Sequence, residues 1–169
     1  LHGGLVVSDA ANYPGAAYSA ESLLVYSEID AVQNAAVDAA VDAAGYPSTI
    51  AYNPKFFLVN GVAFDPAAPA ASTFDAGTSA GTLLLRLANA GLRTHIAAIV
   101  GLELEVRAED GNLYPTPRMH SAVLLPAGKT HDALATVALD RTYAIYDRML
   151  DLTNADAPNG GMLAYLQVG

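Results

Sequence analysis

Four histidines are the side chains of this sequence best suited to hold a metal ion: His2, His95, His120 and His131. No two of them have the His-x-His or His-x-x-x-His spacing that places two ligands together on a strand or a helix. The chain has no cysteine, which excludes disulfides, zinc-thiolate sites and copper-thiolate centres. Three separate strands could still bring His95, His120 and His131 together. The simpler interpretation of each is a half-exposed strand histidine that binds nothing.

A serine nucleophile is a second candidate. The stretch "GTSAG", from Gly77 to Gly81, matches the Gly-x-Ser-x-Gly pattern of an esterase nucleophile elbow centred on Ser79. That elbow needs a strand before the serine and a helix after it. Here a Pro/Ala/Ser-rich stretch precedes Ser79 and a predicted strand follows it. The context favours a flexible loop, and a reactive phosphonate probe would distinguish the two readings.

The carboxylates show no spacing typical of acid–base catalysis. Glu109 and Asp110 are adjacent, so on a strand they would point to opposite faces, and they are better suited to the turn at the following glycine. Asp147 and Asp151 flank Arg148, which favours a surface ion pair. The sequence therefore predicts no catalytic residue.

Composition narrows the classes further. A chain of 169 residues is the size of one large domain and can build its own apolar core. Its formal net charge of −9 would repel a phosphate backbone, so we expect no nucleic-acid partner. No apolar run reaches the roughly 18 residues of a membrane span, so we expect no membrane insertion.

The pattern of elements that must position these side chains is all-β. Runs rich in β-branched and aromatic residues recur about every ten residues, with Gly, Pro and Asn between them, as in an antiparallel sandwich or barrel. Asn60-Gly61 predicts a two-residue hairpin. The alternation from Leu102 to Arg107 is typical of a half-buried strand. One helix is predicted from about Ala31 to Ala44, and residues 65–81 are expected to form a surface loop.

Three segments carry a resemblance: "PKFFLVNGVAFD", "GTLLLRLANAGLRTHIAAIVG" with the residues up to "HDALATV", and "YAIYDRMLDLTNADAPNGGMLAYLQVG". Together they resemble the copper-free middle cupredoxin domain of a bacterial multicopper oxidase of the laccase-like family. The resemblance covers roughly residues 54–169. The motifs that carry it are, in order, Asn60-Gly61, Arg86 with Asn89-Ala90, Asp110-Gly111, and Pro126, Gly128 and Asp132. It implies a cupredoxin-like Greek-key β-sandwich or barrel with one short inserted helix.

The resemblance also implies a domain organisation. Residues 1–7, "LHGGLVV", look like the last strand of a preceding cupredoxin domain, residues 8–19 would be a linker, and residues 20–169 would be the middle domain. The partners would be the flanking cupredoxin domains of the same chain, and the location periplasmic or secreted. An apolar strand without its parent sheet would be disordered, folded back on the sandwich, or paired with another copy, so a homo-oligomer is a further expectation.

In that family the copper ligands lie in the domains on either side. The resemblance implies that His2 occupies a variable position and that His95 is a structural or interface residue. Many members of the family have a histidine directly after the glycine that corresponds to Gly101, whereas this sequence has Leu102 there and so lacks that possible ligand. The parent enzyme would use copper to oxidise a substrate and reduce O2 to water, while this chain would hold no metal, cofactor or catalytic residue. The alternative is a stand-alone β-sandwich that binds a partner or a sugar without redox chemistry.

Overall fold

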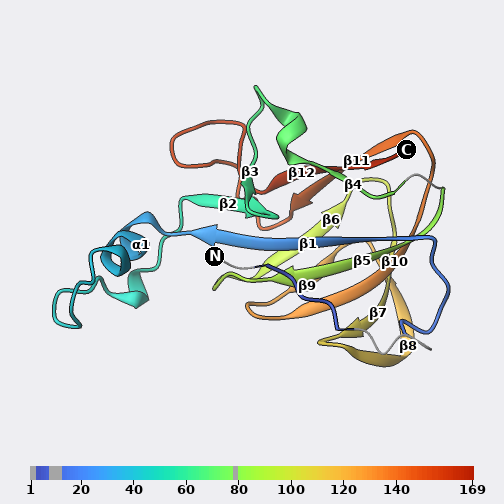
Figure 1. The fold of residues 1–169 in the computed structure, drawn as a ribbon, viewed down its shortest axis with the longest axis horizontal. Helices are drawn as coiled ribbons and strands as arrows, with labels where there is room; N and C mark the ends of the chain where they lie inside the picture. Colours follow the sequence, from blue (N-terminus) through green and yellow to red (C-terminus); the bar gives the residue numbers. More distant parts are fainter. Residues whose placement is uncertain (1–2, 8–12, 78–79) are drawn as a thin grey trace.

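A computed structural model describes residues 3–7, 13–77 and 80–169 of the chain. Two β-sheets pack face to face (Figure 1). The larger sheet has the strand order β3-β2-β1-β5-β10-β7-β8, and the smaller one has the order β4-β12-β11-β6-β9. The bounds are β1 Ala20–Ile29, β2 Phe56–Val59, β3 Val62–Ala63, β4 Thr73–Asp75, β5 Gly81–Asn89, β6 His95–Ile99, β7 Leu104–Glu109, β8 Asn112–His120, β9 Val123–Leu125, β10 Thr130–Val137, β11 Arg141–Asp147 and β12 Leu163–Val168.

The sheets are mixed, which corrects the expectation of a purely antiparallel sandwich. β1 runs parallel to β5, with Ala20 opposite Leu83, and β4 runs parallel to β12. The other pairs are antiparallel. Parallel neighbours need a crossover connection, and the long segment between β1 and β5 supplies one. Composition and turn signals carry no information about this pairing.

The core lies between the two sheets and is built by alternating strand residues. On β7, Leu104 and Val106 are buried while Glu105 and Arg107 are partly exposed, so the predicted alternation is confirmed. On β5, Leu83, Leu85 and Leu87 point into the same core as residues of the smaller sheet. This interior gives the sandwich its stability, because buried apolar area is the main favourable term in folding.

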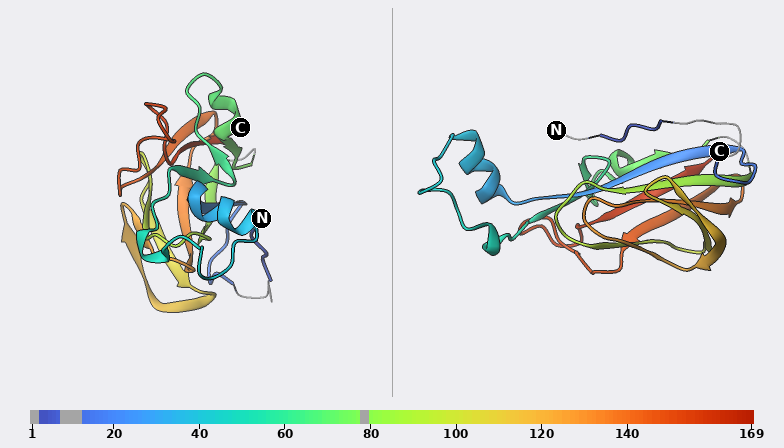
Figure 2. Two further views of the ribbon diagram at one scale, coloured as in Figure 1. Left: turned by 90° about the vertical axis from the view of Figure 1, so that its left-hand side faces the viewer. Right: turned by 90° about the horizontal axis from the view of Figure 1, so that it is seen from below.

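The inserted helix is real but shorter than predicted. α1 spans Ala31–Asp38, and Asp30 caps it by accepting hydrogen bonds from the N–H groups of Val32 and Gln33. The helix projects from one end of the sandwich (Figures 1 and 2) and buries only Ala36, so little packing supports a longer helix. In the described ranges, no helix combines the length and apolarity needed to cross a bilayer.

Two local features test the turn and loop predictions. The hairpin at Asn60-Gly61 is confirmed, with φ values of 51° and 78° that match a two-residue turn between β2 and β3. The loop prediction for residues 65–81 is wrong in part. Pro69–Ser72 forms a 3-10 turn and Thr73–Asp75 forms β4, because Phe74 packs against the core.

The N-terminal segment lies against the larger sheet without joining it. Residues 3–7 have no strand assignment, and Leu5 and Val7 are 87% and 88% exposed. Gly4 sits directly over Leu23 of β1, where a Cβ would come within 2.2 Å of a Leu23 methyl carbon. This is the folded-back arrangement among those expected. Three further expectations stay predictions. They are that residues 1–7 belong to a preceding domain, that residues 8–19 are a linker, and that the segment pairs with another copy of the chain.

The position of Leu85 yields a stability prediction. Its side chain is fully buried at the centre of β5. Leu85→Ala should lower the free energy of unfolding by about 2 to 5 kcal/mol, since it leaves a cavity between two rigid sheets. Leu92→Ala is the control: that side chain is 73% exposed, and the change should stay within about 0.5 kcal/mol. Urea titrations of both variants measure this, and equal midpoints would contradict the assigned core.

Candidate functional site

His95 lies at the start of β6, fully buried between two carboxylates. Its Nδ1 is 2.5 Å from Oδ2 of Asp147 at the end of β11, and its Nε2 is 3.0 Å from Oε2 of Glu28 near the end of β1. β6 and β11 belong to the smaller sheet and β1 to the larger one. These three residues, here called the charged bridge, therefore join the two sheets.

Backbone donors hold Glu28 in its ionised form. Its second carboxylate oxygen, Oε1, accepts hydrogen bonds from the backbone N–H groups of Leu92 and Arg93 at 2.6 and 2.9 Å, and from the Tyr52 hydroxyl at 3.0 Å. The carboxylate reaches these N–H groups by passing over Gly91, where a Cβ would lie 1.8 Å from Oε2. Glycine at this position is therefore a requirement of the bridge.

Asn89 shapes the turn that presents those N–H groups. Its side-chain amide donates to the carbonyls of Arg93 and Leu125, and its side-chain oxygen accepts from the Gly91 N–H. This explains physically why an asparagine stands at the end of β5 in the "R-x-x-N-A" motif. The turn that it closes leads directly into His95.

Asp147 is fixed in the same manner, and Asp151 stands beside it. Oδ1 of Asp147 accepts from the backbone N–H groups of Ile96 and Met149 at 2.8 and 2.9 Å. Asp151 lies 3.8 Å from both His95 Nδ1 and a guanidinium nitrogen of Arg93. Burial and the nearby charge of Asp147 raise the pKa of Asp151. The predicted surface ion pair of Asp147 with Arg148 is wrong, because Asp147 is only 3% exposed and pairs with His95.

The bridge favours a protonated histidine. Burial alone would favour the neutral imidazole, but the hydrogen bonds and charges of Asp147 and Glu28 outweigh it and raise the pKa of His95 to about 9. Burial likewise opposes the ionised form of Glu28, yet the hydrogen bonds from His95 and the backbone of Arg93 and Leu92 lower its pKa to about 2. These two shifts favour a charged imidazole beside an ionised Glu28 at neutral pH.

These donors do not fit a copper-thiolate centre. His95, Asp147 and Asp151 each offer one ligand atom within 4.8 Å of the others, which is close enough for a metal ion. However, both ring nitrogens of His95 already face carboxylates at hydrogen-bond distance, so a metal ion would have to displace a proton held by them, and the sequence contains no thiolate. The geometry supports a structural role for His95, as the resemblance implied. The absence of a metal site stays a prediction.

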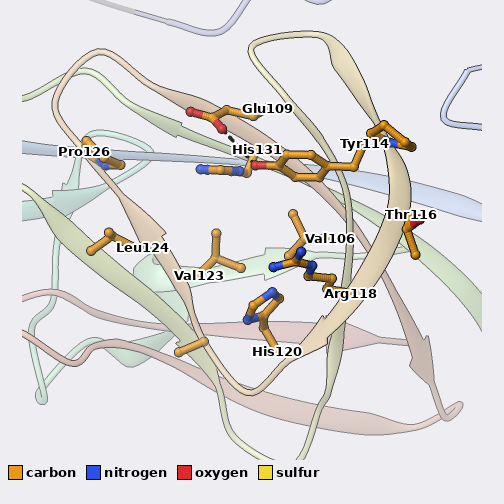
Figure 3. A pocket seen from close by; sticks show the side chains of 12 residues that line it. Val106, Glu109, Tyr114, Thr116, Arg118, His120, Val123, Leu124, Pro126 and His131 are labelled. Carbon is orange, nitrogen blue, oxygen red and sulfur yellow. Dashed lines mark hydrogen bonds between the residues drawn. The ribbon is translucent and has the colours of Figure 1, made fainter.

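The other histidines do not join His95. His120, at the exposed end of β8, and His131, on β10, both line a pocket of about 660 Å³ at an open edge of the sandwich (Figure 3). His131 is 8% exposed, so its interpretation as half-exposed is wrong, and the same holds for His95. His2 and Ser79 lie outside the described residues.

Glu109 and Asp110 serve the turn between β7 and β8, as the sequence indicated. Asp110 has φ 49° and accepts from the Thr130 N–H, and Lys129 Nζ lies 3.0 Å from Glu109 and 2.5 Å from Asp110. Hydrogen bonds from Tyr114 and Lys129 lower the pKa of Glu109. Both carboxylates are thus paired with a cation at neutral pH.

No family model matches the chain, and no curated protein matches it. Solved structures do. A blue copper oxidase from Nitrosomonas europaea matches with a TM-score of 0.68 at 20% identity, over 89% of this chain and 44% of that one. Fet3p, a multicopper oxidase that functions in iron import, matches with a TM-score of 0.66 at 19% identity, over 96% of this chain and 30% of Fet3p. A copper nitrite reductase from N. europaea matches with a TM-score of 0.65 at 14% identity, over 94% of this chain and 52% of the reductase.

At these identities the likeness establishes the fold. The chain is a cupredoxin-like β-sandwich with one short helix, so the predicted fold class is confirmed. It spans less than half the length of the two oxidases and about half that of the nitrite reductase. The match therefore takes in only part of each of these longer chains.

The charged bridge predicts a pH dependence of stability. The pKa of His95 rises from 6.5 to about 9 on folding, so its contribution is complete below pH 6.5 and is lost as the pH rises through 9. The pKa of Glu28 falls from 4.5 to about 2, so its contribution is complete above pH 4.5 and is lost as the pH falls through 2. Their joint contribution is largest between pH 4.5 and 6.5.

We therefore expect the free energy of unfolding to fall by about 3 kcal/mol between pH 6.5 and 9.5 through His95 alone. Urea unfolding at closely spaced pH values measures it. His95→Gln should remove this slope and lower stability at pH 6, because the carboxylates lose the cation between them. His120→Gln, at an exposed position, is the control and should keep the slope. An unchanged slope in His95→Gln would show that the histidine is not charged in the folded state.

Proposed function

We propose that this chain is a copper-free cupredoxin-like domain of a multicopper oxidase, and that its role is to position copper-bearing neighbour domains. The observation that carries the proposal is the extent of the structural match: it takes in about nine-tenths of this chain but only 44% and 30% of two copper oxidases. A domain-sized fragment of a multidomain oxidase accounts for both figures.

The donor inventory supports a domain without its own copper. A blue copper centre needs a cysteine thiolate with two histidines, and the sequence has no cysteine. His95 has both nitrogens committed to carboxylates, and His120 and His131 are apart from it in the pocket. A rigid sandwich closed by buried charges suits a spacer, since electron transfer and ligand geometry tolerate little displacement of the groups involved.

The remaining parts of the proposal rest on the sequence motifs. The flanking cupredoxin domains are the proposed partners, with copper in the parent enzyme and a periplasmic or secreted location. The parent would couple oxidation of a substrate to reduction of O2 to water. Because a copper nitrite reductase shares the fold, the fold alone does not separate these reactions, and the order of the motifs from Asn60 to Asp132 favours the oxidase.

A stand-alone binding sandwich is the second candidate, and the pocket at the open edge is the observation that favours it. The encoding reading frame distinguishes the two. His-x-His pairs before Leu1 and a His-Cys-His motif after Gly169 support the oxidase, whereas their absence from a sequenced full-length gene supports the binding module.

The proposal predicts that the chain of residues 1–169 neither retains copper nor oxidises a phenol. The untagged protein is loaded with Cu(II), dialysed, and analysed for copper by mass spectrometry, with O2 consumption measured on a phenolic substrate. We expect copper near zero per chain and no O2 consumption above buffer.

The matched variants locate any copper that does bind. His95→Gln tests the bridge and His120→Gln tests the pocket. About one copper per chain that is lost in His95→Gln, with His120→Gln unaffected, would contradict the proposal and make His95 a ligand. Copper lost only in His120→Gln would place an unexpected site in the pocket and equally overturn a metal-free domain.

A further inference from the structure

The pocket in Figure 3 lies where the two sheets are not joined. β8 is the edge strand of the larger sheet and β9 is the edge strand of the smaller one. Side chains from β7, β8, β9 and the start of β10 surround a volume of about 660 Å³. This is within the range of roughly 300 to 1,000 Å³ typical of small-molecule sites.

Three basic side chains occupy positions on the inner face of the larger sheet, where apolar residues would be expected. Arg118 lies opposite Val106 and His120 opposite Leu104 in the antiparallel pair of β8 with β7. Residues directly opposite in such a pair point to the same face, and Val106 and Leu104 face the core. His131 lies two residues before the core residue Ala133 on β10, so it points inward as well.

The guanidinium of Arg118 and one ring nitrogen of His131 lack a hydrogen-bond partner among the residues that the structure describes. In the described parts of the chain, Arg118 forms no hydrogen bond or ion pair through its guanidinium. His131 is more than nine-tenths buried, yet its Nδ1 has no hydrogen-bond partner. A buried polar atom without a partner costs free energy, so a ligand that supplies the missing contact is favoured.

The acidic residue at the pocket does not cancel this positive character. Glu109 accepts a hydrogen bond from the Tyr114 hydroxyl at 2.8 Å and pairs with Lys129 at 3.0 Å. Figure 3 shows Glu109, Tyr114 and His131 together at one end of the pocket, while Arg118 and His120 lie side by side at the other. Within a protein of net charge −9, the end of the pocket with Arg118 and His120 is a local concentration of basic side chains.

The rest of the lining is apolar. The apolar lining residues are Val106, Pro115, Val123, Leu124 and Pro126. The ring of Tyr114 adds a flat surface (Figure 3). A hydrated inorganic anion would gain nothing from such walls. An organic anion with an apolar ring would bury that ring against them while its charged group meets the basic end.

We propose that this pocket binds a small organic carboxylate with an apolar ring, with Arg118 and His120 holding the carboxylate and the ring extending toward His131 at the other end. Arg118 is suited to this role because its planar guanidinium can contact both oxygens of a carboxylate. The proposal is independent of the role in a copper oxidase, since it concerns residues that the positioning role does not use.

Benzoate is the probe. We expect its binding to the chain, followed by NMR, to shift the imidazole signals of His120 and His131 while leaving those of His95 in place. Arg118→Gln should weaken binding about tenfold or more, the loss expected when a charge-assisted hydrogen bond is removed. Arg118 is exposed, so this variant should fold normally, and an unchanged urea midpoint checks that.

Three controls decide the result. Arg141→Gln removes an equal charge at an exposed position on β11 and should bind benzoate as the unchanged chain does. Benzamide, which has the ring but no charge, and inorganic phosphate, which has charge but no ring, should both bind at least tenfold more weakly. Equal losses in Arg118→Gln and Arg141→Gln would overturn the site, and phosphate binding as tightly as benzoate would overturn the ligand class.

Discussion

The charged bridge of Glu28, His95 and Asp147 is the constraint on which much of the sandwich depends. A buried imidazolium is stable only with both carboxylates in contact, so the ends of β1, β6 and β11 cannot shift independently. The same carboxylates accept from backbone N–H groups in the connections after β5 and β11. One ionic interaction thereby sets the distance between the sheets and the path of two loops. Apolar packing alone would tolerate more variation, because it has little directionality.

At the edge strands β8 and β9, in contrast, no side chain of the charged bridge joins the two sheets and no strand closes the sandwich. β8 carries Pro115 and Pro117, which lack N–H donors and so make the strand a poor template for another chain. The edge is thus protected from strand addition without being covered. Space remains there for a pocket with basic residues on its inner side. The fold combines a rigid, charged connection with an accessible edge, and these two regions share no residues.

Local patterns in the sequence were sufficient for most of the strands. The alternation in β7 and the Asn60-Gly61 hairpin were read correctly, since both depend on neighbouring residues. The helix was predicted too long because propensity ignores that Ala31–Asp38 has almost nothing to pack against. The partners of His95 were missed, since Glu28 and Asp147 are 67 and 52 positions away.

A usable signal for one of these partners was nevertheless present. In β11, Tyr143 and Ile145 alternate into the core, and the same alternation places Asp147 inside. An aspartate at a core position needs a partner, which argues against a surface ion pair.

The parallel pairing of β1 with β5 also has a kinetic consequence. The chain must close the whole loop from Ala20 to Leu83 before the larger sheet becomes continuous, and such long-range closures slow folding. Until that step, the leucines of β5 lack their β1 neighbour, so this domain should fold more slowly than a sheet of the same size built from local hairpins.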